Sequence, residues 1–352
     1  MTAIHVKSPV LQWSLGPRAQ ARIAANGLQV DDIDLLVGAS GGPKWLVLEG
    51  LDRALFGDFL QARTRPLPCL ASSIGSWRFA CLGQKQPLNA LDRFRDAYLA
   101  QSYPEKVTVH DVSRVLDEVL SHLMGSTGAE EILAHRFLRT SVVAIRSKGL
   151  LRSENKPLLA SGLVATYFAN LVKRDGLGVF CERSLFHDAR QQAASFDDQI
   201  PTAPIELSVQ NLELALRASA AVPLVLAGVK DIPGGPAGVY RDGGVVDYHF
   251  SGAAAGADDL VLYPHFYPYF APGWLDKSRA RRHLTANSWP NLIMVSPSQA
   301  FIDGLPGGKI PDRKDFYNMD NQERIRFWNK VVAESQRLGD AFLQAIEDQR
   351  FE

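Results

Sequence analysis

Short apolar runs alternate with helical spacings over the first quarter of the chain. Residues 33–39 and 67–72 are apolar runs of strand length, and each ends in small residues. After the first run, apolar side chains recur at helical spacing between Trp45 and Phe59, and after the second a small-residue turn opens a helical stretch from Trp77. Two successive strand–turn–helix units predict an α/β fold, a three-layer αβα sandwich in which helices cover both faces of a mostly parallel central sheet.

The remaining pattern predicts further elements of both kinds. The last of them is a long amphipathic helix, with an apolar face from Ile325 to Ile346 and a capping box formed by Asp320 and Glu323. We expect one domain over 1–352, composed of a motif-bearing core at about 33–250 and a C-terminal extension at about 251–352. Other predicted helices lie at 88–102, 111–124 and 212–221, predicted strands at 141–146, 179–181, 238–241, 260–263 and 292–295, and surface loops at 231–238 and 304–313.

Composition places the chain among ordinary globular proteins. Hydrophobic residues make up 46% and charged residues 22%, while Lys+Arg and Asp+Glu both count 38. This balance gives no electrostatic reason to expect a nucleic-acid partner. The sequence has no apolar run of about 18 residues, so we expect a cytoplasmic protein without stable membrane insertion. The three cysteines are too few and too irregularly spaced for a disulfide framework or a zinc site, and we expect reduced thiols.

The turn after the second apolar run carries a candidate nucleophile. A sharp strand-to-helix turn exposes a serine hydroxyl, and it requires small residues two positions before and after that serine. Ala71 and Gly75 meet this requirement around Ser73. In isolation, Ser72, Ser73 and Ser76 are equally explained as helix caps, because serine is favoured there. The catalytic interpretation of Ser73 therefore depends on partners elsewhere in the chain.

A glycine loop between the first strand and its helix is a candidate anion cradle. The backbone N–H groups of Gly41 and Gly42 can approach a ligand closely and hold an oxyanion, whereas Pro43 has no N–H. The same residues could form a tight turn without function. They could also form a nucleotide phosphate loop, but that motif requires glycine where Pro43 stands and a hydroxyl residue where Trp45 stands.

Asp242 is the candidate base. It ends a short predicted strand and is followed by two glycines, and an aspartate within hydrogen-bond reach of a serine can accept its proton. Asp-Gly is also a common turn signal, and taken alone the segment is better explained as an ordinary turn. A Ser-Asp-His triad is a further possibility, because His249, His265 and His283 follow Asp242 in the chain order of the α/β-hydrolases.

Taken together, these motifs resemble those of the patatin-like phospholipases, which are lipid acyl hydrolases with a Ser-Asp dyad on an αβα sandwich. The similar segments are the oxyanion loop at 40–44, the G-x-S-x-G elbow at 71–75, the small-residue segment at 217–223 and the D-G-[GA] motif at 242–244. The resemblance covers roughly residues 33–250. Three positions depart from it, since Ser40, Trp45 and Ala71 stand where the family has glycine.

The resemblance implies a function. Ser73 would be the nucleophile, Asp242 the base, and Gly41 with Gly42 the oxyanion donors of a hydrolase that cleaves an ester of a lipid or related substrate. It implies no metal and no organic cofactor, and it is compatible with transient contact with a lipid interface. The three glycine replacements would instead fit a catalytically silent binding or assembly module. The oligomeric state is not indicated.

An aromatic segment at 263–270, followed by Trp274, has two interpretations. It would either line an acyl pocket or contact a lipid interface, or it would pack onto the core as an irregular segment, and we favour packing.

Overall fold

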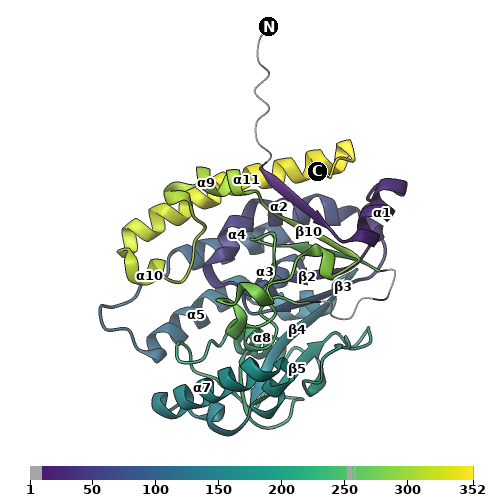
Figure 1. Cartoon of the computed structure of the whole chain (residues 1–352). Coiled ribbons are helices and arrows are strands. Elements are labelled where there is room, and N and C mark those ends of the chain that lie inside the picture. The colour runs from purple at the N-terminus through teal and green to yellow at the C-terminus, as the bar shows by residue number, and fades with distance from the viewer. Residues whose placement is uncertain (1–9, 252–255, 257–258, 352) are drawn as a thin grey trace.

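The computed structural model describes residues 10–251, 256 and 259–351, and within them the chain forms a ten-stranded sheet with flanking helices (Figure 1). The main path through the sheet runs β1-β10-β9-β2-β3-β4-β5-β6, and β8 pairs with both β4 and β7. The strands are β1 (Leu11–Leu15), β2 (Ile33–Gly38), β3 (Leu67–Ser72), β4 (Leu138–Ser147), β5 (Cys181–His187), β6 (Thr202–Glu206), β7 (Val229–Lys230), β8 (Val239–Asp242), β9 (Leu260–Pro264) and β10 (Leu292–Pro297).

The centre of the sheet is parallel. Strands β10, β9, β2, β3 and β4 form one continuous parallel block, and antiparallel pairs occur only outside it. These central strands are buried along almost their whole length, as expected when helices cover a parallel sheet. The predicted three-layer α/β class with a mostly parallel sheet is therefore confirmed.

Helices separate many of the strands along the sequence, and the last three helices follow the final strand. The longest, α11, runs along the top of the view in Figure 1, and α7 lies at the lower edge. The helices are α1 (Pro17–Asn26), α2 (Glu49–Gly57), α3 (Ile74–Leu82), α4 (Pro87–Leu99), α5 (Val109–Met124), α6 (Gly128–Leu133), α7 (Lys156–Val172), α8 (Leu212–Ser219), α9 (Gln299–Gly304), α10 (Asp315–Asn318) and α11 (Asn321–Asp348).

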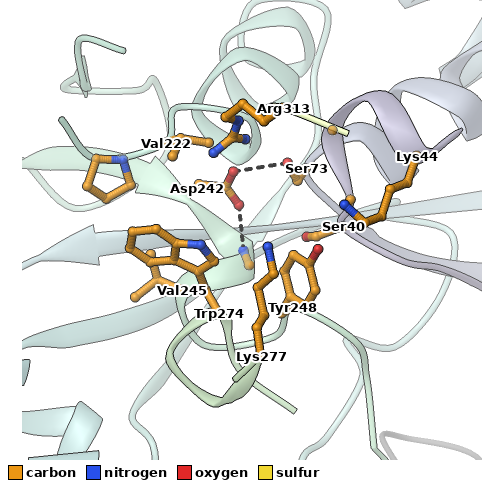
Figure 2. A pocket seen from close by; sticks show the side chains of 14 residues that line it. Ser40, Lys44, Ser73, Val222, Asp242, Val245, Tyr248, Trp274, Lys277 and Arg313 are labelled. Atoms are coloured by element: carbon orange, nitrogen blue, oxygen red, sulfur yellow. Dashed lines mark hydrogen bonds between the residues drawn. The ribbon is translucent and has the colours of Figure 1, made fainter. Parts of the chain in front are cut away.

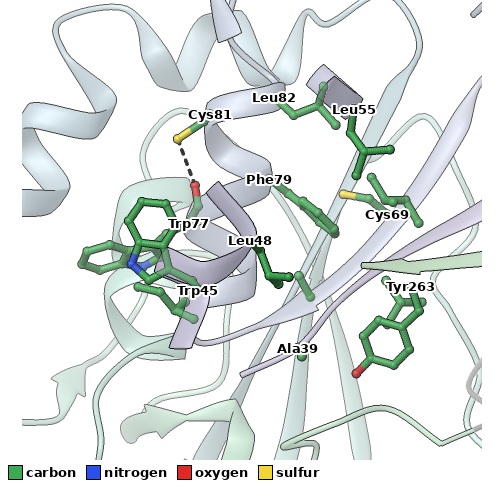
Figure 3. Packing of buried hydrophobic residues seen from close by; sticks show 14 of the residues in the cluster. Ala39, Trp45, Leu48, Leu55, Cys69, Trp77, Phe79, Cys81, Leu82 and Tyr263 are labelled. Atoms are coloured by element: carbon green, nitrogen blue, oxygen red, sulfur yellow. Dashed lines mark hydrogen bonds between the residues drawn. The ribbon is translucent and has the colours of Figure 1, made fainter. Parts of the chain in front are cut away.

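A large hydrophobic core joins the sheet to the helices around α3 (Figure 3). Trp45 stacks on Phe94 of α4 with ring centroids 4.3 Å apart, and Trp77 of α3 is fully buried beside them. Helix α11 packs closely on α2, because a Cβ atom on Gly50 would lie 2.2 Å from the backbone oxygen of Ser335. The C-terminal helix is thus fastened to the helical layer that covers the core.

The parallel order of β2 and β3 decides where a site can form. Gly38, the last residue of β2, pairs with Ala71 near the end of β3, so the loops that follow both strands emerge at the same edge of the sheet. Strand β8 runs antiparallel to β4 and brings Asp242 opposite Ala144, one residue beyond the β4 partner of Ser72. The three segments predicted to cooperate therefore converge.

Most predicted elements are present, with some shifts. The predicted strand at 179–181 is wrong, because Arg174–Val179 is a 3-10 helix and β5 begins at Cys181. The helical spacing after Trp45 belongs to a 3-10 helix, Gly42–Leu48, followed by α2. Asp320 caps α11 by accepting a hydrogen bond from the Glu323 amide. The single-domain organisation stays a prediction.

Two further findings concern the whole described chain. Its helices include none that combines the length and apolar character needed to cross a bilayer. All three cysteines, Cys69, Cys81 and Cys181, are buried and free of disulfides, which confirms the prediction of unpaired thiols.

Candidate active site

Ser73 sits at the turn between β3 and α3 in a strained backbone conformation. Its φ of 54° and ψ of −133° lie in a region that L-residues seldom adopt, at a cost of about 1–3 kcal/mol. The surrounding structure holds this conformation: the Ser73 amide donates to Ser219 Oγ at 2.7 Å, and Ser219 in turn donates to the Val143 carbonyl at 2.6 Å. Ser219 belongs to the small-residue segment 217–223, so that segment supports the turn.

The small residues around Ser73 are required by close packing against β2. A Cβ atom on Gly75 would lie 2.6 Å from the Gly38 backbone, so no larger residue fits there without movement. Ala71 is accommodated because its β2 partner is a glycine: a Cβ on Gly38 would lie 2.9 Å from the Ala71 methyl group. The methyl group of Ala71 thus fits because Gly38 has no side chain.

The hydroxyl of Ser73 meets the carboxylate of Asp242. Ser73 Oγ donates to Asp242 Oδ2 at 3.0 Å, and the Gly244 amide donates to the other carboxylate oxygen, Oδ1, at 2.7 Å (Figure 2). The Asp242 amide donates to the Ala221 carbonyl at 3.0 Å, so the segment 217–223 supports both members of the pair. The geometry fits direct proton transfer from the hydroxyl to the carboxylate.

The surroundings of Asp242 tune its basicity. Burial raises its pKa from 3.8 to about 6, because a charged carboxylate loses hydration there. The hydrogen bonds from Gly244 and Ser73, and the nearby charges of Arg313 and Lys277, act in the opposite direction. At neutral pH the group is thus ionised and yet a stronger base than an exposed aspartate.

The glycine loop lies beside this pair. Gly41 and Gly42 both line the cavity that contains Ser73, and within the described part of the chain neither amide donates a hydrogen bond. Gly42 has a φ of +55°, and a Cβ on Gly41 would lie 2.6 Å from the Phe266 ring. Glycine is therefore needed at both positions, and their amides are available to a ligand.

Ser40 has a structural role in the glycine loop. Its hydroxyl lies 2.7 Å from Ser72 Oγ, and Ser72 donates its own proton to the Asp247 carbonyl at 2.6 Å. Ser40 must therefore be the donor to Ser72. This chain of hydrogen bonds ties the glycine loop to the end of β3.

The cavity above the pair has a volume of about 140 Å³ and is rich in cations. Lys44, Lys277 and Arg313 point into it (Figure 2), and none of them forms an ion pair with a carboxylate of the described chain. Lys44 is only 9% exposed, and burial, followed by the charge of Lys277, lowers its pKa to about 8. The full lining consists of Ser40, Gly41, Gly42, Lys44, Ser73, Val222, Pro223, Asp242, Gly244, Val245, Tyr248, Trp274, Lys277 and Arg313.

Three lining residues come from the C-terminal extension, and sequence reasoning singled out only one of them, Trp274. Trp274 and Lys277 follow β9, and Arg313 precedes α10. The ammonium group of Lys277 lies 4.9 Å from the ring centroid of Tyr248. No local motif marks Lys277 or Arg313, because only the folding of the extension brings them to the cavity.

The histidines proposed for a triad lie away from the pair. His249 Nδ1 accepts from the Ala271 amide at 3.0 Å, and His265 Nδ1 lies 2.7 Å from the Tyr267 carbonyl. Among the described residues no histidine hydrogen-bonds to Ser73 or Asp242. Burial lowers the pKa of His265 to about 3, so it stays neutral in the core. The structure does not support the histidine-dependent mechanism.

Packing also decides between the interpretations of Trp45 and of the aromatic segment. The Trp45 ring is buried against Phe94, so the position that a nucleotide phosphate loop needs for its hydroxyl points into the core. In the aromatic segment, Phe266 and Phe270 are buried, as the packing interpretation predicts, whereas Trp274 lines the cavity.

Comparison with known proteins gives structural matches only. No protein-family model and no curated protein sequence matches this chain. Human GIVD cytosolic phospholipase A2 is similar with a TM-score of 0.40 and 13% identity, over 98% of this chain and 66% of that one. VipD from Legionella pneumophila is similar with a TM-score of 0.32 and 11% identity, over 75% of this chain and 54% of that one. The chain thus spans less than two thirds of either protein.

Proposed function

We propose that this protein is a serine acyl hydrolase of the patatin-like type, which cleaves a carboxylic ester of a lipid or related molecule through a Ser73–Asp242 dyad. The observation that carries the proposal is the 3.0 Å hydrogen bond from Ser73 Oγ to Asp242 Oδ2 within a cavity that Gly41 and Gly42 also line. A nucleophile, a base and free backbone amides are the groups that acyl transfer requires.

In the first half of the reaction, Asp242 takes the proton of Ser73 as Oγ bonds to the ester carbonyl carbon. The carbonyl oxygen becomes an oxyanion, to which the amides of Gly41 and Gly42 donate. When this intermediate collapses, the bond to the alcohol breaks and Asp242 returns its proton to the departing oxygen. The acyl group is then bound to Ser73.

In the second half, Asp242 takes a proton from water while the water oxygen attacks the acyl carbon. Collapse of the second intermediate releases the carboxylic acid, and Ser73 Oγ leaves with the proton held by Asp242. The ester and this water are the only reactants from outside the chain, and every proton transfer in both halves involves Asp242.

The cations around the dyad favour a substrate whose negative charge lies near the scissile ester bond. Lys44, Lys277 and Arg313 form no ion pair within 4.0 Å among the described residues, and a phosphate or carboxylate of the substrate would pair with them more closely than Asp242 and the other nearby carboxylates do. The apolar part of the lining, which includes Val222 and Trp274, would contact the acyl group.

The proposal is tested by labelling with a fluorophosphonate, which reacts with activated serines. The wild-type protein should be labelled and Ser73→Ala should not, while Ser121→Ala, a change at an exposed serine of α5, should match the wild type. Labelling that persists in Ser73→Ala would remove Ser73 from its role. A folded wild-type protein that never reacts, and that turns over no nitrophenyl ester, would favour the silent binding module.

A further inference from the structure

Helix α7 presents an apolar face to solvent. Leu158, Val164, Phe168 and Val172 are 48%, 56%, 59% and 90% exposed. At 100° per residue these four side chains span an arc of about 120°, so they form one face of the helix. We call this face the α7 surface. In the 17-residue helix the only charged residue is Lys156 at its start.

Apolar residues of α7 lie on its exposed side as well as on its buried side, unlike those of an ordinary surface helix. Its buried side combines Leu159 and Leu163 with the polar residues Thr166 and Asn170, and Asn170 Nδ2 donates to Asp276 Oδ1 at 2.8 Å. A helix that covers a core normally directs its apolar stripe inward and its polar residues to water. The outward apolar face of α7 is therefore typical of a surface that another apolar phase covers.

A basic segment, residues 277–282, lies against α7. The Arg279 guanidinium lies 5.5 Å from the ring centroid of Tyr167, and Arg282 donates to the Asn170 carbonyl at 2.7 Å. Within the described chain, Arg279 and Arg281 have no acidic partner, whereas the nearby Asp276 is paired with Arg282. An apolar face beside cations that have no acidic partner is complementary to a binding partner with an apolar interior and an anionic boundary.

Helix α7 is connected to the candidate active site through its buried side. Trp274 packs against the cluster formed by the α7 residues Leu159 and Leu163 with Leu151, and Trp274 also lines the cavity. Lys277, the first residue of the basic segment, lines the same cavity. Trp274 and Lys277 thus join the buried side of α7 and the basic segment to the cavity that contains Ser73.

From these contacts we propose that the α7 surface docks the protein onto a lipid bilayer that contains anionic lipids, and that the ester substrate passes from this bilayer to Ser73. The second clause rests on the proposed function, and the first does not. A second copy of the chain is a less suitable occupant, because a two-fold contact across α7 would bring the basic segments of both copies close together without neutralising them.

The test measures flotation of the full-length protein with vesicles of phosphatidylcholine, with and without phosphatidylserine. The wild type should bind vesicles that contain phosphatidylserine. Phe168→Asp should weaken binding roughly tenfold or more through lost apolar burial, and Arg281→Gln about fivefold through lost charge. Val209→Asp, which changes an exposed valine outside α7, is the matched control and should bind as the wild type does.

Three readouts keep this proposal separate from the catalytic one. Fluorophosphonate labelling in solution should be equal in the wild type and Phe168→Asp, and an unchanged unfolding temperature shows that the exposed site tolerates the change. Equal vesicle binding by the wild type and Phe168→Asp would overturn the docking proposal. So would a concentration-dependent dimer in sedimentation that Phe168→Asp abolishes, without any vesicle binding. Failure of labelling alone would overturn the catalytic proposal and leave docking standing.

Discussion

At the scale of single residues, burial of Asp242 decides both how strong a base it is and when it is ionised. Lost hydration raises its pKa to about 6, and the hydrogen bond from Gly244 limits the rise. An exposed aspartate would be ionised over a wider range but would accept a proton less readily. The proposed dyad needs no histidine for this reason, because the carboxylate itself is tuned towards neutral pH.

The pH dependence of turnover follows from this value. Asp242 is active as a base only when deprotonated, so kcat/KM for a neutral soluble ester should fall as the pH decreases through about 6. The measurement is the pH profile of kcat/KM between pH 4 and 8, with intact folding checked by circular dichroism at each end. A flat profile across this range, from a protein that stays folded, would contradict the role of Asp242.

At the scale of elements, sequence patterns predicted those parts whose signals are local. The turn at Ser73 was predictable because its small neighbours must clear β2, and the start of α11 because Asp320 caps it. Helix α7 was not predicted, since apolar residues on its outward face obscure the periodicity of a surface helix. The strand predicted at 179–181 was misplaced because Val179, although apolar, ends a 3-10 helix and is exposed.

The turn around Ser73 depends on an element far away in sequence, and this dependence can be measured. In Ser219→Ala the buried Ser73 amide would lose its acceptor, at a cost of about 1–3 kcal/mol in the free energy of unfolding. Because the strained turn would relax, we also expect the rate of fluorophosphonate labelling to fall. Urea unfolding and labelling kinetics test this, with Ser161→Ala on the exposed side of α7 as the matched control. An unchanged labelling rate would show that the turn holds its geometry without Ser219.

At the scale of the whole molecule, the C-terminal extension completes both the sheet and the cavity. Strand β9 lies between β2 and β10, so the extension forms part of the parallel block. Local patterns predicted β9 and β10 as strands, but they could not predict that Lys277 and Arg313 would meet Lys44. Such contacts depend on the path of the whole chain, and the spacing of residues in the sequence does not indicate that path.

The contribution of the extension to substrate choice gives the last prediction. Arg313→Gln removes one of the three cavity cations, so kcat/KM for an ester bearing a phosphate or carboxylate should fall roughly tenfold relative to a neutral ester with the same acyl group. Arg313 also lowers the pKa of Asp242, and its loss should therefore shift the acid limb of the pH profile towards higher pH for both esters. The measurement is the ratio of kcat/KM for the two esters at a pH well above 6, where Asp242 is ionised in both proteins. Arg326→Gln, on the side of α11 outside this cavity, serves as the control and should leave the ratio unchanged. An equal loss for both esters at that pH would mean that Arg313 supports the structure of the cavity and does not recognise the charge of the substrate.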